Sequence, residues 1–274
     1  MSNERIGREA AEEFRDQFQL GVEPISSLAR LIEQKVSVGV AYVEAPTPGH
    51  GMTMRHGTRH LIAVGCTEHP MRLRSTLAHE LGHLRLGTVD RDLNHSAWDK
   101  RTPEEIQADS FARHLLVPLD AVRAASQKTD PSTALLSDLV QTYMASPSIV
   151  AIQLREAQVI DTNTYQEWSA LTTGQLAFQF GWHTEYVSLA SQSMTPRAPQ
   201  SLLARAVEGY RWGLVTAAAI ARLDGKHDQR LVSKQLQAEG IVPLSFYDTP
   251  PQRPPQSGIP LTEDEIRLLL SDSE

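Results

Sequence analysis

The sequence predicts an α+β fold in which a small antiparallel sheet precedes a long run of helices. Residues 36–44 alternate and are rich in valine, which predicts a strand, and residues 52–56 and 60–65 predict two more. Apolar residues at helical spacing then dominate the chain from about residue 70 onward. These patterns indicate an α+β domain followed by a mainly helical C-terminal region.

The composition is that of an ordinary globular protein, with 274 residues of which 41% are hydrophobic and 22% charged. The net charge of −7 argues against a general basic surface for nucleic acid, although it leaves room for a local basic patch. Cys66 is the one cysteine, so no intrachain disulfide is expected. The polar start does not predict a signal peptide. No run of about 18 apolar residues occurs, so no membrane span is predicted. A cytoplasmic protein is therefore expected.

A five-residue motif, HELGH at residues 79–83, lies within the helix predicted for residues 70–86. Histidines four apart on a helix stand on the same face, so His79 and His83 can hold one metal ion together. Glu80, between them, lies within reach of a water on that metal. This pattern is typical of zinc metallopeptidases, which need two histidine ligands and a general base. The sequence therefore predicts His79 and His83 as zinc ligands and Glu80 as the catalytic base.

The residues around the motif support this interpretation. At about 100° per residue the two histidines lie within about 40° of each other, and three leucines fall on the opposite side of the helix. Pro70 suits the first helical turn and Gly87 suits the C-terminal end. The alternative is a solvated helix with two incidental histidines. That alternative explains neither the glutamate nor the apolar opposite side.

Glu105, in the helix predicted to start after Thr102, has two competing interpretations. It fits the N3 position of a capping box, with Thr102 as the N-cap and Pro103 as N1. Glu105 also continues the row of apolar residues on one face of that helix, three residues before the first of them. A carboxylate that faces inward costs free energy unless it is paired or bound to metal. We favour Glu105 as the third zinc ligand, with Glu104 as the fallback. Asp109 is expected to accept the free ring N–H of a ligating histidine.

The stretch from Arg74 to Pro118 resembles the ImmA/IrrE family of zinc metallopeptidases. That family pairs HExxH with a later E-x-x-A-[ND]-x-F-A-x-x-L-L-x-P motif, and residues 105–118, EIQADSFARHLLVP, match it. The resemblance extends over about residues 18–160. It implies a zincin-like fold, one Zn²⁺ per chain and a helix-turn-helix-like unit after the peptidase core.

The domain organisation follows from these patterns. Residues 125–160 predict two helices around a turn at 145–147. They are either a DNA-binding helix-turn-helix or a pair packed on the catalytic domain, and we favour the packed pair because only Gln153 and Arg155 offer contacts to DNA. The expected regions are a zincin-like metallopeptidase domain at 1–124, a helix-turn-helix-like helical pair at 125–160, a C-terminal helical region at 161–246, and a Pro-rich linker with a short tail helix at 247–274.

Four further residues are candidates for roles at the site. His95, Arg85 and Tyr143 are unranked candidates for contacting substrate or stabilising the oxyanion. Cys66 follows the strand at 60–65, and a thiolate there would be a strong zinc ligand able to displace the catalytic water. The alternative for Cys66, which is the more common case, is a small buried residue at a strand end.

The predicted function is zinc-dependent hydrolysis of a peptide bond. The resemblance implies that the substrate is an Xre-type helix-turn-helix repressor, cut to derepress stress, phage-defence or mobile-element genes. One alternative is a non-catalytic metal-containing regulator, or anti-repressor, that binds the repressor or DNA. The intact Glu80 argues against it, because a structural site needs no base and normally has four protein ligands. The oligomeric state is left open.

Overall fold

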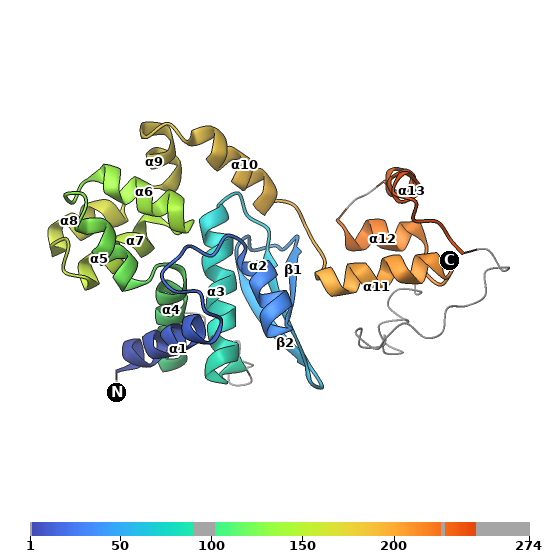
Figure 1. Ribbon diagram of the computed structural model, residues 1–274, viewed down its shortest axis with the longest axis horizontal. Coiled ribbons are helices and arrows are strands. Elements are labelled where there is room, and N and C mark those ends of the chain that lie inside the picture. The colour runs from blue at the N-terminus through green and yellow to red at the C-terminus, as the bar shows by residue number, and fades with distance from the viewer. Residues whose placement is uncertain (1, 90–101, 226–227, 245–274) are drawn as a thin grey trace. The chain divides into compact units, whose positions relative to one another are not determined.

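The computed structural model describes residues 2–89, 102–225 and 228–244. The α+β fold class predicted from the sequence is confirmed: a three-stranded sheet packs against helices and is followed by further helices (Figure 1). The chain divides into two compact units, one at residues 1–195 and one from residue 196 onward. His95, the Pro-rich segment and the expected tail helix lie outside the described residues. No helix in the described part is both long enough and apolar enough to cross a membrane.

The first unit contains the sheet and ten α-helices within its described residues. Its elements are α1 (Asn3–Gln17), α2 (Leu28–Leu31), the π-helical turn η1 (Ile32–Val36), β1 (Gly39–Val43), β2 (Gly51–His56), β3 (Arg59–Gly65), α3 (Pro70–Leu86), α4 (Pro103–Leu116), α5 (Leu119–Ser126), α6 (Thr133–Tyr143), α7 (Pro147–Glu156), α8 (Thr162–Ser169), α9 (Thr173–Gln179) and α10 (His183–Ser193).

The sheet is mixed, which corrects the expectation of an antiparallel sheet. Its order is β1-β3-β2, with β1 parallel and β2 antiparallel to β3. A tight turn at Gly57, where φ is +58°, makes β2 and β3 a hairpin. The segment between β1 and β2 instead carries the chain past β3, so that β2 occupies the far edge. Thr53 and Val40 both pair with Ile62, and this face of the sheet turns toward α3.

Helices α1, α3 and α4 pack against one another (Figure 1). Their backbones approach closely at two points, one between α3 and α4 and one between α1 and α4. A Cβ on Gly82 of α3 would stand 3.0 Å from the Phe111 ring and 3.2 Å from the Ala108 Cα of α4. A Cβ on Gly7 of α1 would stand 2.1 Å from the Gln107 carbonyl oxygen of α4. A side chain at residue 7 would overlap α4, and one at residue 82 would press on it, so the two glycines allow the close spacing of the three helices.

The segment that joins α1 to α2 is held by buried arginine side chains from two helices, α1 and α3. Arg15 donates to the carbonyl oxygens of Gly21 and Glu23, at 2.7 and 2.5 Å, and to that of Leu115 at the end of α4. Arg74 of α3 donates to the carbonyl oxygen of Ile25. Burial lowers the pKa of Arg15, and it lowers the pKa of Arg74 to about 10. These carbonyl oxygens give the two guanidinium groups polar partners inside the core.

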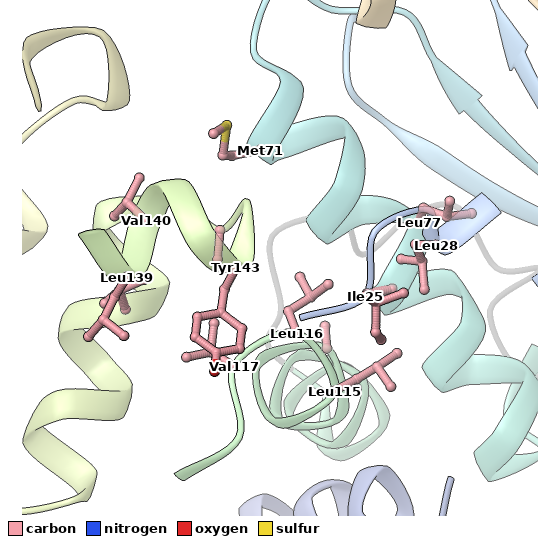
Figure 2. Packing of buried hydrophobic residues seen from close by; sticks show 14 of the residues in the cluster. Ile25, Leu28, Met71, Leu77, Leu115, Leu116, Val117, Leu139, Val140 and Tyr143 are labelled. Atoms are coloured by element: carbon pink, nitrogen blue, oxygen red, sulfur yellow. The ribbon is translucent and has the colours of Figure 1, made fainter. Parts of the chain in front are cut away.

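The main core of the first unit runs from the sheet across α3 and α4 into α6 and α7 (Figure 2). It includes fully buried Leu77 and Leu81 on α3 and Leu115 and Leu116 on α4. Tyr143 belongs to this core, and its hydroxyl donates to the Val22 carbonyl oxygen at 3.1 Å. The leucines predicted to lie behind the metal-binding motif therefore anchor α3 in the core.

The helical pair α6 and α7 packs on the rest of the first unit through the face of α7 that bears Gln153. Gln153 is fully buried, and its amide donates to the Val117 carbonyl oxygen at 2.7 Å and to His114 Nδ1 at 3.2 Å. The Arg155 guanidinium lies 4.0 Å from the centroid of the Tyr165 ring. Gln153 is therefore not available to contact DNA, because its polar atoms face the protein interior.

The second unit is a small three-helix arrangement. Its described helices are α11 (Gln200–Arg211), α12 (Ala217–Leu223) and α13 (Gln229–Ala238). A separate apolar cluster joins them, made of Ala206, Ile220, Ala221, Val232 and Leu236.

Candidate metal centre

The two motif histidines meet on the side of α3 that faces Glu105 of α4. Pro70 occupies the first turn of this helix, and Gly87 ends it with φ +67°, as the sequence predicts. His79 Nε2 and His83 Nε2 lie 3.0 Å apart. The side chain of His83 is 6% exposed and that of His79 is 19% exposed. Both imidazoles therefore turn the same nitrogen toward a single point beside α3.

Glu105 reaches this point from α4. Its Oε2 lies 3.2 Å from His79 Nε2 and its Oε1 lies 3.4 Å from His83 Nε2. The backbone N–H of Glu105 meanwhile donates to the Thr102 hydroxyl at 3.3 Å. Thr102 is thus the N-cap of α4, as expected, but the Glu105 carboxylate, which a capping box would turn back to the Thr102 N–H, joins the histidines instead. Glu104 is not part of the cluster.

The donor set suits one metal ion. Among the described residues, His79, His83 and Glu105 form a group whose ligand atoms all lie within 4.8 Å of one another. Ligands about 2.0–2.1 Å from a tetrahedral zinc ion stand about 3.3 Å apart, close to the 3.0–3.4 Å separations found here. Three protein ligands leave a fourth position free, which is the pattern of catalytic rather than structural zinc sites.

The second nitrogen of each imidazole is held by another residue. His79 Nδ1–H donates to Asp109 Oδ1 at 2.9 Å, which is the contact expected for Asp109. His83 Nδ1 lies 2.8 Å from the Thr88 hydroxyl, which itself donates to the His83 carbonyl oxygen at 3.4 Å. Because the Thr88 hydroxyl uses its hydrogen there, it accepts from His83 Nδ1–H. Because Nδ1 of each histidine is held in this way, Nε2 is the nitrogen that each imidazole would offer to a metal.

The charges of the site favour a cation. Burial lowers the pKa of His79, but the hydrogen bonds that its ring donates to Asp109 and Glu105 outweigh burial and raise that pKa to about 10. Hydrogen bonds with His79 and then His83 hold the pKa of Glu105 well below its usual range. Two carboxylates thus surround His79, and a bound cation would supply the positive charge that a proton otherwise supplies.

Glu80 is held on the β2 side of α3. The Thr53 hydroxyl of β2 donates to Glu80 Oε2 at 2.8 Å. A Cβ on Gly51 would stand 2.7 Å from Glu80 Cγ and 2.8 Å from Oε1, so the absence of a side chain there makes room for the carboxylate. Glu80 is therefore oriented by β2, next to the two histidines in sequence but outside the three-residue cluster.

The remaining candidates lie elsewhere or outside the described residues. The Tyr143 hydroxyl donates to the Val22 carbonyl oxygen, and the Arg85 guanidinium lies 5.4 Å from the centroid of the Phe14 ring. Cys66 is buried at the end of β3 and is not part of the cluster; burial first, and then the Glu44 charge, raise the pKa of its thiol. His95 lies outside the described residues.

Sequence reasoning missed two hydroxyl groups, those of Thr53 and Thr88, that hold site residues in place. Thr88 follows the helix-ending Gly87, five residues after His83, and Thr53 lies on a strand 27 residues before Glu80. No spacing rule connects a helix ligand to a residue beyond the helix end or to a strand. Gly87 was the one feature of the sequence that could have indicated Thr88, because a glycine that ends a helix turns the chain back toward the last helical turn.

One comparison with known proteins identifies the domain. A family model described as the IrrE N-terminal-like domain of peptidase M78 matches residues 37–155. No curated protein matches the chain. The matched residues include β1–β3, α3 and α4, and therefore every residue of the cluster. The chain thus carries a metallopeptidase domain of the M78, IrrE-like family, with a candidate metal site at His79, His83 and Glu105.

Proposed function

We propose that the chain is a zinc-dependent endopeptidase that uses Glu80 as its base. The observation that carries the proposal is the convergence of three ligand atoms within 4.8 Å, beside a glutamate fixed by its own hydrogen bond. A zinc ion held by His79, His83 and Glu105 supplies Lewis acidity, which activates water and polarises a peptide carbonyl. The family match supports this chemistry over a purely structural metal.

The residues of the chain then handle the proton. The Thr53 hydroxyl donates to one oxygen of Glu80, which leaves the other oxygen to accept a proton from the attacking water. Glu80 next passes that proton to the leaving amine. Asp109 and Thr88 keep the imidazoles in the tautomer that ligates, so neither histidine competes for the proton.

The proposed substrate is a helix-turn-helix transcriptional repressor of the Xre type, cleaved in the cytoplasm to derepress stress, phage-defence or mobile-element genes. Support for this step comes from the family resemblance over the two motifs. The alternative of a non-catalytic regulator is less well supported, because Gly51 and Thr53 are arranged around Glu80, a residue that a structural site does not need.

The test compares three forms of the full chain on an Xre-type repressor encoded next to its gene. Glu80→Gln keeps shape and metal but cannot accept a proton, so cleavage is expected to fall by at least ~10²-fold while zinc per chain is unchanged. Glu167→Gln, an exposed change on α8, serves as the matched control and should cut like the wild type. Cleavage undiminished by Glu80→Gln would contradict the mechanism. If either form leaves the repressor uncleaved but abolishes its binding to DNA, the non-catalytic regulator is favoured.

A further inference from the structure

The described helices of the second unit pack together as a three-helix module. Helices α12 and α13 are joined by the short connection at residues 224–228, which contains Gly225 at φ +64°. Figure 1 shows α11 and α12 lengthwise and α13 end on, so α13 crosses the other two steeply. Two packed helices that follow each other closely in sequence, with a third helix packed on them, are the framework of helix-turn-helix proteins.

The end of α12 is held by the first residues of the unit. The Ala198 N–H donates to the Leu223 carbonyl oxygen at 3.1 Å, at the end of α12. A Cβ on Gly225 would stand 2.9 Å from the Pro196 carbonyl oxygen. Asp228 then caps α13, because its carboxylate accepts from the backbone N–H groups of Arg230 and Leu231. The direction in which α13 leaves α12 is therefore set by packing and hydrogen bonds.

The outer face of α13 is basic and polar. Val232 and Leu236 are buried in the small core, so the opposite face carries Arg230, Lys234 and Gln237, all of them exposed. Neither Arg230 nor Lys234 forms an ion pair with a residue in the described part of the chain. Arginine, lysine and glutamine are the side chains that contact phosphates and base edges in the major groove.

Residues 196–244, which contain the described helices of the second unit, differ in net charge from the rest of the chain. Residues 196–244 contain seven Lys and Arg against four Asp and Glu, a net charge of +3. Residues 245–274 contain two Lys and Arg against six Asp and Glu, so the unit as a whole, from residue 196 onward, has a net charge of −1. Residues 1–195 contain seventeen against twenty-three, a net charge of −6. Positive charge concentrated on one small helical module of an acidic chain is the electrostatic pattern of nucleic-acid binding.

We propose that the exposed face of α13, formed by Arg230, Lys234 and Gln237, binds the major groove of double-stranded DNA. A helix about 10–12 Å across fits a groove about 12 Å wide. Duplex DNA is favoured over single-stranded RNA because α13, QRLVSKQLQA, has no aromatic residue on which an unpaired base could stack. This proposal is independent of the peptidase activity.

The test measures binding of the full chain to a short fluorescent DNA duplex of mixed sequence between about 50 and 200 mM salt. Replacing both cations, as Arg230→Ala with Lys234→Ala, is expected to weaken binding about tenfold or more and to lower the log–log salt slope by about two. The matched control removes two exposed cations of the first unit, as Arg123→Ala with Lys128→Ala, and should bind like the wild type.

A gain-of-binding variant separates the proposal from a loss of fold. Gln237→Lys adds one cation to the same exposed face, so it should tighten binding and raise the salt slope by about one. The proposal is overturned if the wild type does not bind duplex at about 50 mM salt, or if the control loses as much affinity as the α13 variant. Tighter binding to a single-stranded RNA of equal length would also overturn it. These readouts need no cleavage, so they stand apart from the outcome of the peptidase test.

Discussion

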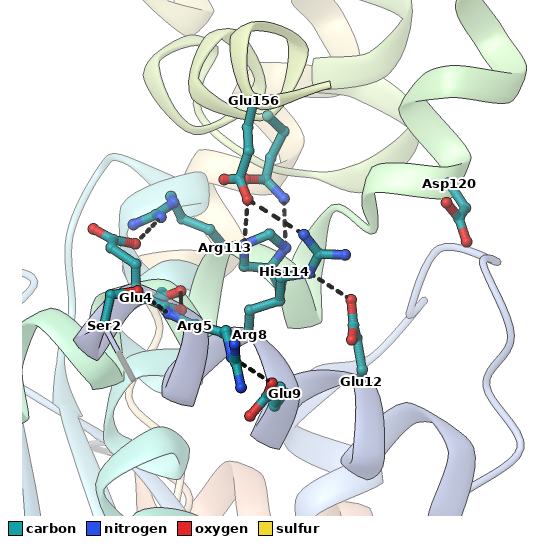
Figure 3. Close-up of polar contacts among 12 residues, drawn as sticks. Ser2, Glu4, Arg5, Arg8, Glu9, Glu12, Arg113, His114, Asp120 and Glu156 are labelled. Carbon is teal, nitrogen blue, oxygen red and sulfur yellow. Dashed lines mark hydrogen bonds and ion pairs between the residues drawn. The ribbon is translucent and has the colours of Figure 1, made fainter. Parts of the chain in front are cut away.

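Two polar clusters occupy opposite ends of α4, and each joins histidine to glutamate. At the first turn, Glu105 lies against His79 and His83. At the last turn, buried His114 lies 3.5 Å from Glu156 through its Nε2 and accepts from Gln153 through its Nδ1 (Figure 3). Arg8 adds a longer contact to Glu156, at 3.8 Å. The residue types are nearly the same, but the hydrogen bonds leave different groups available.

The difference lies in where each imidazole proton points. Gln153 donates to His114 Nδ1, so the ring hydrogen sits on Nε2 and points at Glu156, which satisfies both nitrogens. At the metal centre the ring hydrogens point away, to Asp109 and Thr88. The two Nε2 atoms and the Glu105 carboxylate then face one another. The metal centre therefore suits a cation, whereas the His114 cluster is complete as a structural contact.

The largest expected effect on metal binding is that of removing the carboxylate. In Glu105→Ala, bound zinc is expected to fall from about one per chain to near zero, because two neutral histidines alone form an incomplete site. The helix cap should survive, since the backbone N–H of residue 105 still donates to Thr102, so the free energy of unfolding of the metal-free protein should change by less than about 1 kcal/mol.

Metal analysis of the purified Glu105→Ala variant, with thermal unfolding in chelator, checks both parts. Glu104→Ala is the matched control, one residue earlier in the same helical turn, and should retain zinc. Full zinc occupancy in Glu105→Ala would mean that Glu105 is not a zinc ligand and serves only in the cap of α4. Loss of zinc only in Glu104→Ala would move the ligand to that position.

The next effect concerns the hydroxyl that orients His83. Thr88→Val keeps the shape of the side chain but leaves His83 Nδ1 without its buried partner, so zinc affinity is expected to fall about 10–100-fold. Thr88→Ser restores the hydroxyl and should restore most of the affinity. Competition with a chromophoric zinc chelator measures both. Equal affinity of the Val and Ser variants would show that Thr88 serves packing alone.

The two clusters also show how far sequence reasoning reaches. HELGH and the apolar row that ends at Glu105 are local helical patterns, so the three ligands were predicted from spacing alone. The partners that set the tautomers are different, because Thr88 lies beyond the helix end and Gln153 lies on another helix. The parallel pairing of β1 with β3 was missed for the same reason: strand direction is decided by which strand occupies the centre of the sheet.

The smallest expected effect on metal binding is that of removing His114. In His114→Leu, zinc content should stay at about one per chain, because His114 and the ligands belong to separate hydrogen-bond networks. Stability should fall, since Gln153 and Glu156 each lose a partner in a region where His114 is only 3% exposed. A cost of about 1–3 kcal/mol is typical of leaving buried polar groups unpaired, which lowers the melting temperature by several degrees. Differential scanning fluorimetry and metal analysis on one preparation check both. Loss of zinc at unchanged melting temperature would mean that the far end of α4 takes part in the metal site, and the distinction between the two clusters would fail.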